Sequence, residues 1–206
     1  YDALASHGNQ ITGKGLASST IRGIHSMLHE ALDAAKQAGL IPWNPTEEIP
    51  TPKFACKVKQ ILTDEQLDIF MAIIQQDDIW HDFFYTELTT GLRRGEICGL
   101  KWTDFNEADS TLKVRRTIHQ ETGGELTAWD TKTTAGTRTI ILPPSTVELL
   151  RERQKSALTE WIFPDPLRPE QPTRPSAAYN RMKSLLKAAG LPDLRFHDLR
   201  HTFATH

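Results

Sequence analysis

Cysteine is scarce in this chain of 206 residues, and long apolar runs are missing from it. The two cysteines, Cys56 and Cys98, lie far apart, so they form neither a disulfide framework nor a zinc ribbon. This composition favours a reducing compartment, and we expect a cytoplasmic location. No apolar run approaches the roughly 20 residues that span a bilayer, so no membrane partner is expected.

The chain also has little net charge, −2 at pH 7, which at first argues against a nucleic-acid partner. The charge is unevenly distributed, however. Residues 59–110 carry four basic and eleven acidic side chains, whereas residues 111–206 carry fifteen basic and ten acidic ones. A basic C-terminal half can face phosphates while the acidic segment faces water or another protein. Chance clustering on solvated faces would explain the same numbers.

A long amphipathic helix is predicted to begin near Ser18, Ser19 or Thr20, any of which can cap it. Gly39 and the prolines that follow are expected to end it. Its apolar stripe consists of Ile21, Ile24, Leu28, Leu32 and Ala35. One helix cannot bury its own stripe, so we expect part of this first domain to precede Tyr1.

The remaining pattern predicts a linker and then a second domain. Residues 44–60 contain three prolines and lack periodicity, which is typical of a linker, and we place the linker at 46–60. Thr63 and Gln66 have the spacing of a capping box at the start of a new helix. Further helical segments flank β-like runs, "STLKVRRTIHQ" and "RTIILP", with a hairpin turn at "ETGGEL". The predicted fold is mainly α with a small, three-stranded antiparallel sheet (α+β).

Arg93 is the first candidate for binding an anion. It stands in "TTGLRRGE" at a helix start, where a cation is unfavourable unless an anion also lies there. Glu96 follows three residues later, so it shares a face with Arg93 and can orient the guanidinium toward two oxygens of one phosphate. An ordinary surface ion pair is the competing interpretation of this spacing.

The final segment, "RFHDLRHTFATH", contains a second candidate. On a helix, His197 and Arg200 project to one side and supply an anion clamp with a proton carrier. His197 and His201 also have a spacing able to bind zinc, but no glutamate stands between them as in a zinc protease. A buried, structural role for His201 is the third interpretation, and it is the one we favour.

Lys132 is the third candidate. It lies in "WDTKTTAGTR", on a predicted connection between strands, from which its amine can contact a phosphate or release a proton. Most lysines on turns are simply solvated.

Together these segments resemble the tyrosine recombinases, also called phage integrases. "TTGLRRGE" resembles the first arginine box of that family, "TKTTAGTRTIILP" its lysine hairpin, and "HDLRHTFATH" its H-x-x-R box. The resemblance, closest to integrases of Gram-positive phages and conjugative transposons, implies three parts. These are the C-terminal part of a helical core-binding domain (1–45), a linker (46–60) and an incomplete catalytic domain (61–206).

The resemblance also implies residue roles. Arg93 and Arg200 would bind the non-bridging oxygens of the scissile phosphate, and Glu96 would brace Arg93. Lys132 would protonate the departing 5′ oxygen, and His197 would assist proton transfer. The family's nucleophilic tyrosine follows the second box, whereas every tyrosine here precedes it. We therefore expect residues 1–206 alone to be unable to cleave DNA.

The expected function is site-specific recombination of a mobile element through a 3′-phosphotyrosine intermediate. The alternatives are a non-catalytic DNA-binding module from a truncated integrase and, within the enzymes, a type IB topoisomerase. The expected partners are double-stranded DNA at recombination sites and further copies of the protein, as a tetramer on DNA. No metal or other cofactor is expected. Candidate DNA contacts are Arg22, Lys36, Arg115, Arg116, Arg181, Lys183 and Lys187.

Overall fold

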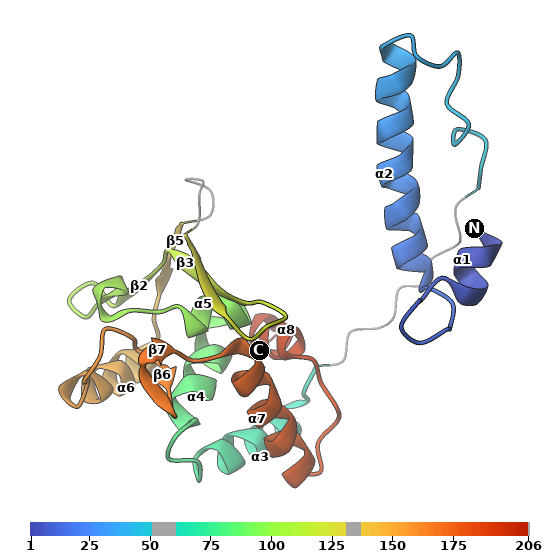
Figure 1. The fold of residues 1–206 in the computed structure, drawn as a ribbon. Coiled ribbons are helices and arrows are strands. Elements are labelled where there is room, and N and C mark those ends of the chain that lie inside the picture. The colour runs from blue at the N-terminus through green and yellow to red at the C-terminus, as the bar shows by residue number, and fades with distance from the viewer. Residues whose placement is uncertain (51–60, 131–136, 206) are drawn as a thin grey trace. The chain divides into compact units, whose positions relative to one another are not determined.

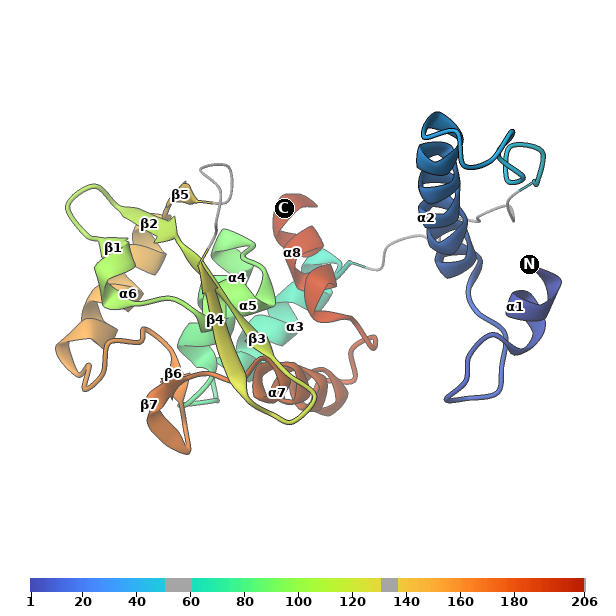
Figure 2. The same cartoon turned by 45° about the horizontal axis from the view of Figure 1, so that its top comes forward.

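The computed structural model describes residues 1–50, 61–130 and 137–205, in two compact units, Tyr1–Val58 and Lys59–His206. Figures 1 and 2 show their elements from two directions. The helices are α1 (Asp2–His7), α2 (Ser18–Gln37), α3 (Asp64–Ile74), α4 (His81–Thr90), α5 (Arg94–Cys98), the 3-10 turn η1 (Trp102–Asp104), α6 (Pro144–Lys155), α7 (Pro175–Ala188) and α8 (Phe196–Thr205). The strands are β1 (Phe105–Asn106), β2 (Thr111–Val114), β3 (Arg116–Gln120), β4 (Leu126–Asp130), β5 (Arg138–Ile141), β6 (Pro164–Asp165) and β7 (Arg168–Pro172). None of these helices is long and apolar enough to cross a bilayer.

The long helix α2 of the first unit forms as predicted, but its start differs. Ala17 is the N-cap residue, and no side chain caps the helix. The predicted capping by Ser18, Ser19 or Thr20 is therefore wrong. The end is as predicted, because Gly39 has φ +71° and the Leu40 amide donates to the Ala35 carbonyl.

The segment after α2 folds back onto it. The side-chain Nδ2 of Asn44 donates to Asp33 Oδ1 at 2.8 Å and to the His29 carbonyl at 3.1 Å, and Asn44 is fully buried. Thr46, which the sequence assigned to the linker, is buried and bonds to Asn44 Oδ1. The first unit therefore extends past the predicted boundary at residue 45, and its identity as a core-binding domain stays a prediction.

The second unit begins with the predicted capping box. The Gln66 amide donates to Thr63 Oγ1, and the Thr63 amide donates to Gln66 Oε1. Phe70 and Ile74 of α3 are buried in the core of this unit. Local spacing was enough to predict this element because both partners of the cap lie within one turn.

Phe83 of α4 lies at the centre of an aromatic cluster that joins distant segments. Its ring centroid is 5.5 Å from that of Trp80, 5.3 Å from that of Phe163 and 6.4 Å from that of Phe196. Edge-to-face pairs of this kind add about 0.5–1.5 kcal/mol each to the apolar burial. Because Phe196 begins α8, the cluster fixes the start of that helix against α4.

The strands form three small antiparallel sheets instead of one three-stranded sheet. Their order is β1-β2-β5 in one sheet, with β3-β4 and β6-β7 as separate pairs. The run that was predicted as one strand breaks at Arg115, and its two halves pair with different partners. The hairpin turn at 121–125 is confirmed, as is the fold class, mainly α with small antiparallel sheets.

The β3–β4 hairpin and four helices position the site. β3 packs against both α5 and α7, and α8 packs against α4. Figures 1 and 2 show these elements within the second unit, where the segments of α5 and α8 contain the two arginine boxes. Segments more than 100 residues apart in the sequence therefore meet at one place.

Candidate active site

Arg93 and Glu96 form the pair that the sequence predicted, and they do so at the first turn of α5. The Arg93 amide donates to Glu96 Oε2 at 2.8 Å, and its Nη1 donates to Glu96 Oε1 at 2.9 Å. The carboxylate thus caps the helix and holds the guanidinium at once. The Arg93 side chain stays 62% exposed, so its other donors face outward, available for an anion.

Arg138 is a further member of this cluster that sequence reasoning missed. From the first position of β5, its Nη1 and Nη2 donate to Glu96 Oε1 and Oε2 at 2.7 and 2.6 Å. This two-pronged geometry is the strongest form of an arginine–carboxylate pair. Arg138 lies in the segment "TKTTAGTRTIILP", but nothing in its local spacing indicates a partner 42 residues away.

The two arginines keep the buried Glu96 carboxyl ionised. Burial alone would raise its pKa, but the hydrogen bonds from Arg138 and from Arg93 outweigh burial and lower the pKa of Glu96 to about 2. Glu96 is only 3% exposed. A fixed negative charge therefore lies beneath Arg93 at every physiological pH.

Arg200 reaches the same place from α8. Its Nη1 donates to the Gly91 carbonyl at 2.6 Å, two residues before Arg93. Gly91 ends α4 in the left-handed conformation, φ +58°, so its carbonyl belongs to the negative end of that helix. The Gly91 carbonyl thus orients the Arg200 guanidinium without neutralising its positive charge.

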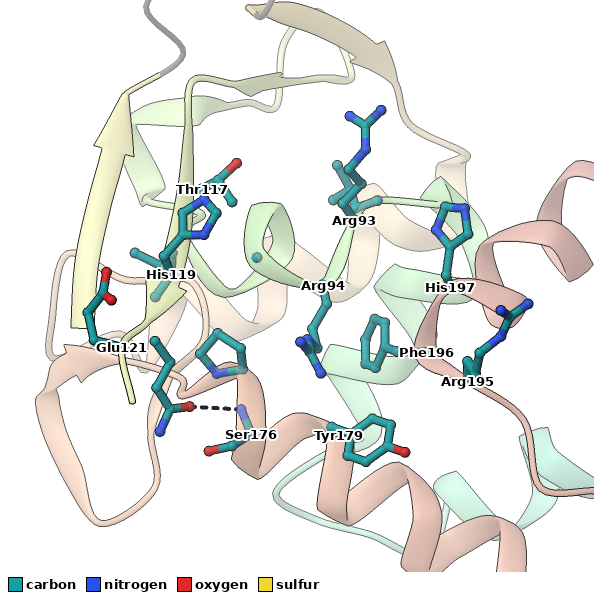
Figure 3. A pocket seen from close by; sticks show the side chains of 15 residues that line it. Arg93, Arg94, Thr117, His119, Glu121, Ser176, Tyr179, Arg195, Phe196 and His197 are labelled. Atoms are coloured by element: carbon teal, nitrogen blue, oxygen red, sulfur yellow. Dashed lines mark hydrogen bonds between the residues drawn. The ribbon is translucent and has the colours of Figure 1, made fainter. Parts of the chain in front are cut away.

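His197 lines one pocket together with Arg93. The pocket has a volume of about 770 Å³ and is bordered by α5, β3, α7 and the start of α8. Figure 3 shows Arg93 and His197 pointing to the same side of it, away from Tyr179 and Ser176 of α7. His197 thus joins Arg93 at this pocket from a distant segment, while Glu96 bonds to Arg93 and Arg200 bonds to Gly91.

Two predicted features lie outside the described residues. They are Lys132 and the side chain of His201, so the zinc-ligand and buried-histidine interpretations of His201 stay untested. Among the residues that are described, no group of three or more potential ligands could hold a metal ion. Binding of an anion by the guanidinium groups stays a prediction.

The predicted DNA contacts differ in what their side chains already do. Arg116 is 13% exposed at the side chain and donates to the Gly99 carbonyl and to buried Asp104, which favours a structural role over a DNA contact. Arg181 and Lys183 pair with Asp77 and Asp193. The remaining candidates all lie on exposed positions: Arg22, Lys36, Arg115 and Lys187. A DNA-binding role for each stays a prediction.

Gly95 allows α5 to approach β3 closely, and filling this space should disturb the site. A methyl group there would lie 2.7 Å from the Ile118 carbonyl oxygen and 2.6 Å from Thr117 Cγ2. Because a backbone atom cannot move aside cheaply, we expect Gly95→Ala to lower the free energy of unfolding of the second unit by about 1–3 kcal/mol. Denaturant unfolding followed by circular dichroism would measure this.

Gly123→Ala is the matched control, since a methyl group at Gly123 meets nothing within 4 Å. We expect this change to stay within about 0.5 kcal/mol of the parent protein. Equal effects of the two substitutions would contradict the proposed close approach of α5 and β3.

These features define a mainly helical fold in which Arg93 and His197 line one pocket and Arg200 bonds to Gly91, two residues before Arg93. The model of the phage integrase family matches residues 60–206, and the chain belongs to this family of tyrosine recombinases.

Curated relatives agree with this assignment. The chain is 26% identical over 226 residues to a tyrosine recombinase XerC-like protein of Caldanaerobacter subterraneus subsp. tengcongensis, covering 96% of this chain and 57% of that protein. It is 25% identical over 199 residues to the ICEBs1 integrase of Bacillus subtilis, covering 91% and 54%. The chain thus spans about half the length of the curated relatives it matches.

Solved structures share the fold. The Tn1549 transposon integrase in complex with transposon right end DNA has a TM-score of 0.80 at 24% identity, covering 93% of this chain and 67% of that one. A lambda integrase dimer bound to a COC′ core site has a TM-score of 0.63 at 23% identity, covering 91% and 66%. At these identities the likeness concerns the fold.

Proposed function

We propose that the protein to which this chain belongs is a site-specific DNA recombinase that integrates or excises a mobile element. The observation that carries the proposal is that Arg93 and His197 line one pocket, while Arg200 of α8 bonds to the Gly91 carbonyl two residues before Arg93. Family membership and the integrases among the relatives support it. The neighbouring structures include integrases bound to DNA, one of them a lambda integrase tetramer bound to a Holliday junction.

In the proposed reaction a tyrosine attacks the scissile phosphate and forms a 3′-phosphotyrosine link. Arg93 and Arg200 bind the non-bridging oxygens and stabilise the negative charge that develops on them. Glu96 positions Arg93, and Arg138 in turn positions Glu96. Lys132 or His197 delivers a proton to the departing 5′ oxygen.

Double-stranded DNA and further copies of the protein, as a tetramer on two duplexes, are the partners in this proposal. The exposed basic candidates Arg22, Lys36, Arg115 and Lys187 would contact phosphates outside the site. Affinity should then fall steeply with salt, because each contact releases counterions. A cytoplasmic location belongs to the same proposal.

A nicked suicide duplex from the ends of the mobile element tests the proposal. We expect the complete protein to form a covalent adduct with it, and mass spectrometry of the linked peptide should identify a tyrosine. Residues 1–206 alone should bind the same duplex, with affinity falling by about 10³-fold or more when salt rises fourfold, and form no adduct. A DNA-binding complete protein without an adduct would contradict the recombinase proposal.

Tyr179 provides the control for this experiment, because it is a tyrosine that lines the same pocket. The Arg94 guanidinium lies 5.7 Å and the Lys183 amine 5.2 Å from the centre of its ring. These contacts give it a packing role between α5 and α7. Tyr179→Phe should therefore leave adduct formation by the complete protein unchanged, and an adduct on Tyr179 itself would reject the assignment.

A further inference from the structure

Glu87 is a buried acid for which the proposed chemistry has no use. It lies on the last turn of α4 and is 0% exposed, and neither carboxyl oxygen has a hydrogen-bond partner within the described parts of the chain. Burying an unpartnered polar group costs free energy, and an ionised carboxylate would cost far more. Burial accordingly raises the pKa of Glu87 well above its ordinary range, so the neutral acid is the favoured form.

Two charges of the candidate site act on Glu87. The Arg200 guanidinium opposes the rise in the pKa of Glu87, and the Glu96 carboxylate adds to it. Glu87 is also linked to Arg200 through the backbone. The Gly91 amide donates to the Glu87 carbonyl at 2.8 Å, while the Gly91 carbonyl accepts from Arg200.

The helices packed against α4 carry other charged or titratable side chains that could act on Glu87. Those that the structure describes are paired with other residues or exposed to solvent. Arg153 of α6 bonds to Asp82, at the opposite end of α4 from Glu87. On α8, Asp198 is engaged by Arg195, and His197 is exposed. The exposed carboxylates of α3 and the ion pairs of α6 are Asp64, Glu65, Asp68, Glu148–Arg151 and Glu152–Lys155. The buried thiol of Cys98 is a further titratable neighbour of Glu87.

The two arginines of the site are therefore held in different ways. Arg93 bonds to the ionised carboxylate of Glu96, whereas Arg200 bonds to a neutral carbonyl. As long as Glu87 keeps its proton, its carboxyl group carries no charge to balance that of Arg200. The guanidinium group of Arg200 therefore stays available to an incoming anion. Ionised, Glu87 would compete with that anion for the same guanidinium.

We propose that Glu87 is a proton-linked positioning residue: its neutral form leaves Arg200 to the substrate phosphate, and its ionised form draws Arg200 away. This inference rests on the proposed function, because it takes Arg200 to be a phosphate ligand. By linkage, binding of the phosphate and retention of the proton by Glu87 favour each other. Glu87 does not touch the substrate in this scheme.

Sulfate binding to residues 1–206 tests the inference, because the charge of sulfate does not change over the range of interest. Titrations followed by NMR of the arginine Nε–H groups would compare the parent protein with Glu87→Gln between about pH 6 and about pH 9, a range that includes raised carboxyl pKa values. We expect the parent to lose affinity as the pH rises. Over that range the loss of sulfate affinity in Glu87→Gln should be smaller than the loss in the parent by a factor of about five or more. Protonation of His197 affects both proteins alike and cancels in the comparison.

A second variant, Glu87→Leu, guards against effects particular to the buried amide and should show the same flattened pH profile. A purely structural role for Glu87 would shift affinity equally at every pH and would overturn the inference.

Arg200→Ala separates the proposed role of Glu87 from the proposed phosphate site. If sulfate binds to the parent and is lost in Arg200→Ala while Glu87→Gln keeps the parental pH profile, the phosphate site stands and the role of Glu87 is rejected. If the parent binds no sulfate, the phosphate assignment of Arg200 fails and the role of Glu87 fails with it.

Discussion

Replacing Arg200 with alanine in the complete protein is expected to reduce DNA strand cleavage by about 10²–10³-fold, as does the loss of a donor to a developing oxyanion elsewhere. Arg93→Ala should have an effect of similar size, because each guanidinium would contribute bonds that strengthen in the transition state. DNA affinity should change by less than about tenfold, since one phosphate contact among many is lost. Adduct formation on a suicide duplex and a mobility-shift titration measure the two quantities.

Lys155→Ala is a suitable control for the loss of one positive charge. Lys155 ends α6, pairs with Glu152 and is 66% exposed at the side chain. We expect cleavage by this variant to match that of the parent. Cleavage preserved in both Arg93→Ala and Arg200→Ala would reject their assignment as phosphate ligands.

Glu96→Gln should be the most destabilising single change at the site. The substitution leaves Arg93 and Arg138 facing a neutral amide, and because both arginines reach solvent we expect a loss of about 1.5–3 kcal/mol, the usual worth of a hydrogen bond to a charged group. The pH dependence identifies the cause. Because the folded-state pKa of Glu96, about 2, lies below the ordinary value of 4.5, the stabilisation by its charge is complete above about pH 4.5. It is lost as the pH falls toward 2.

Denaturant unfolding at a series of pH values measures this effect. We expect the difference between the parent and Glu96→Gln to shrink steadily on acidification. Glu152→Gln removes an exposed carboxylate of a surface pair and should have little effect at any pH. A difference that stays constant down to about pH 2 would show that the ionised carboxylate of Glu96 does not contribute as proposed.

The parts of the site that could be predicted from sequence are those set by local spacing. Glu96 lies one turn from Arg93, and Thr63 one turn from Gln66, so a helix alone brings each pair together. Gly91 likewise ends α4 in the left-handed conformation, which glycine adopts without strain. In these cases the partners meet whatever the rest of the chain does.

Features that depend on tertiary register could not be predicted in this way. Arg138 reaches Glu96 because β5 pairs with β2, and the β-branched run gave no sign that it would change partners at Arg115. Arg116 looked like a basic residue on a strand, but its burial against Asp104 depends on where η1 lies. Glu87 looked like an ordinary helical acid, and its isolation is visible only once α3, α6 and α8 are packed against α4.

The left-handed end of α4 has a genetic consequence. Gly91 supplies the carbonyl that fixes Arg200 and, two residues later, the chain enters the turn that presents Arg93. A bulky or β-branched residue adopts φ +58° only with strain, so one altered codon at this position would misplace both guanidinium groups. In the proposed recombinase, a single missense change at Gly91 would therefore abolish the reaction while both arginine codons stay intact.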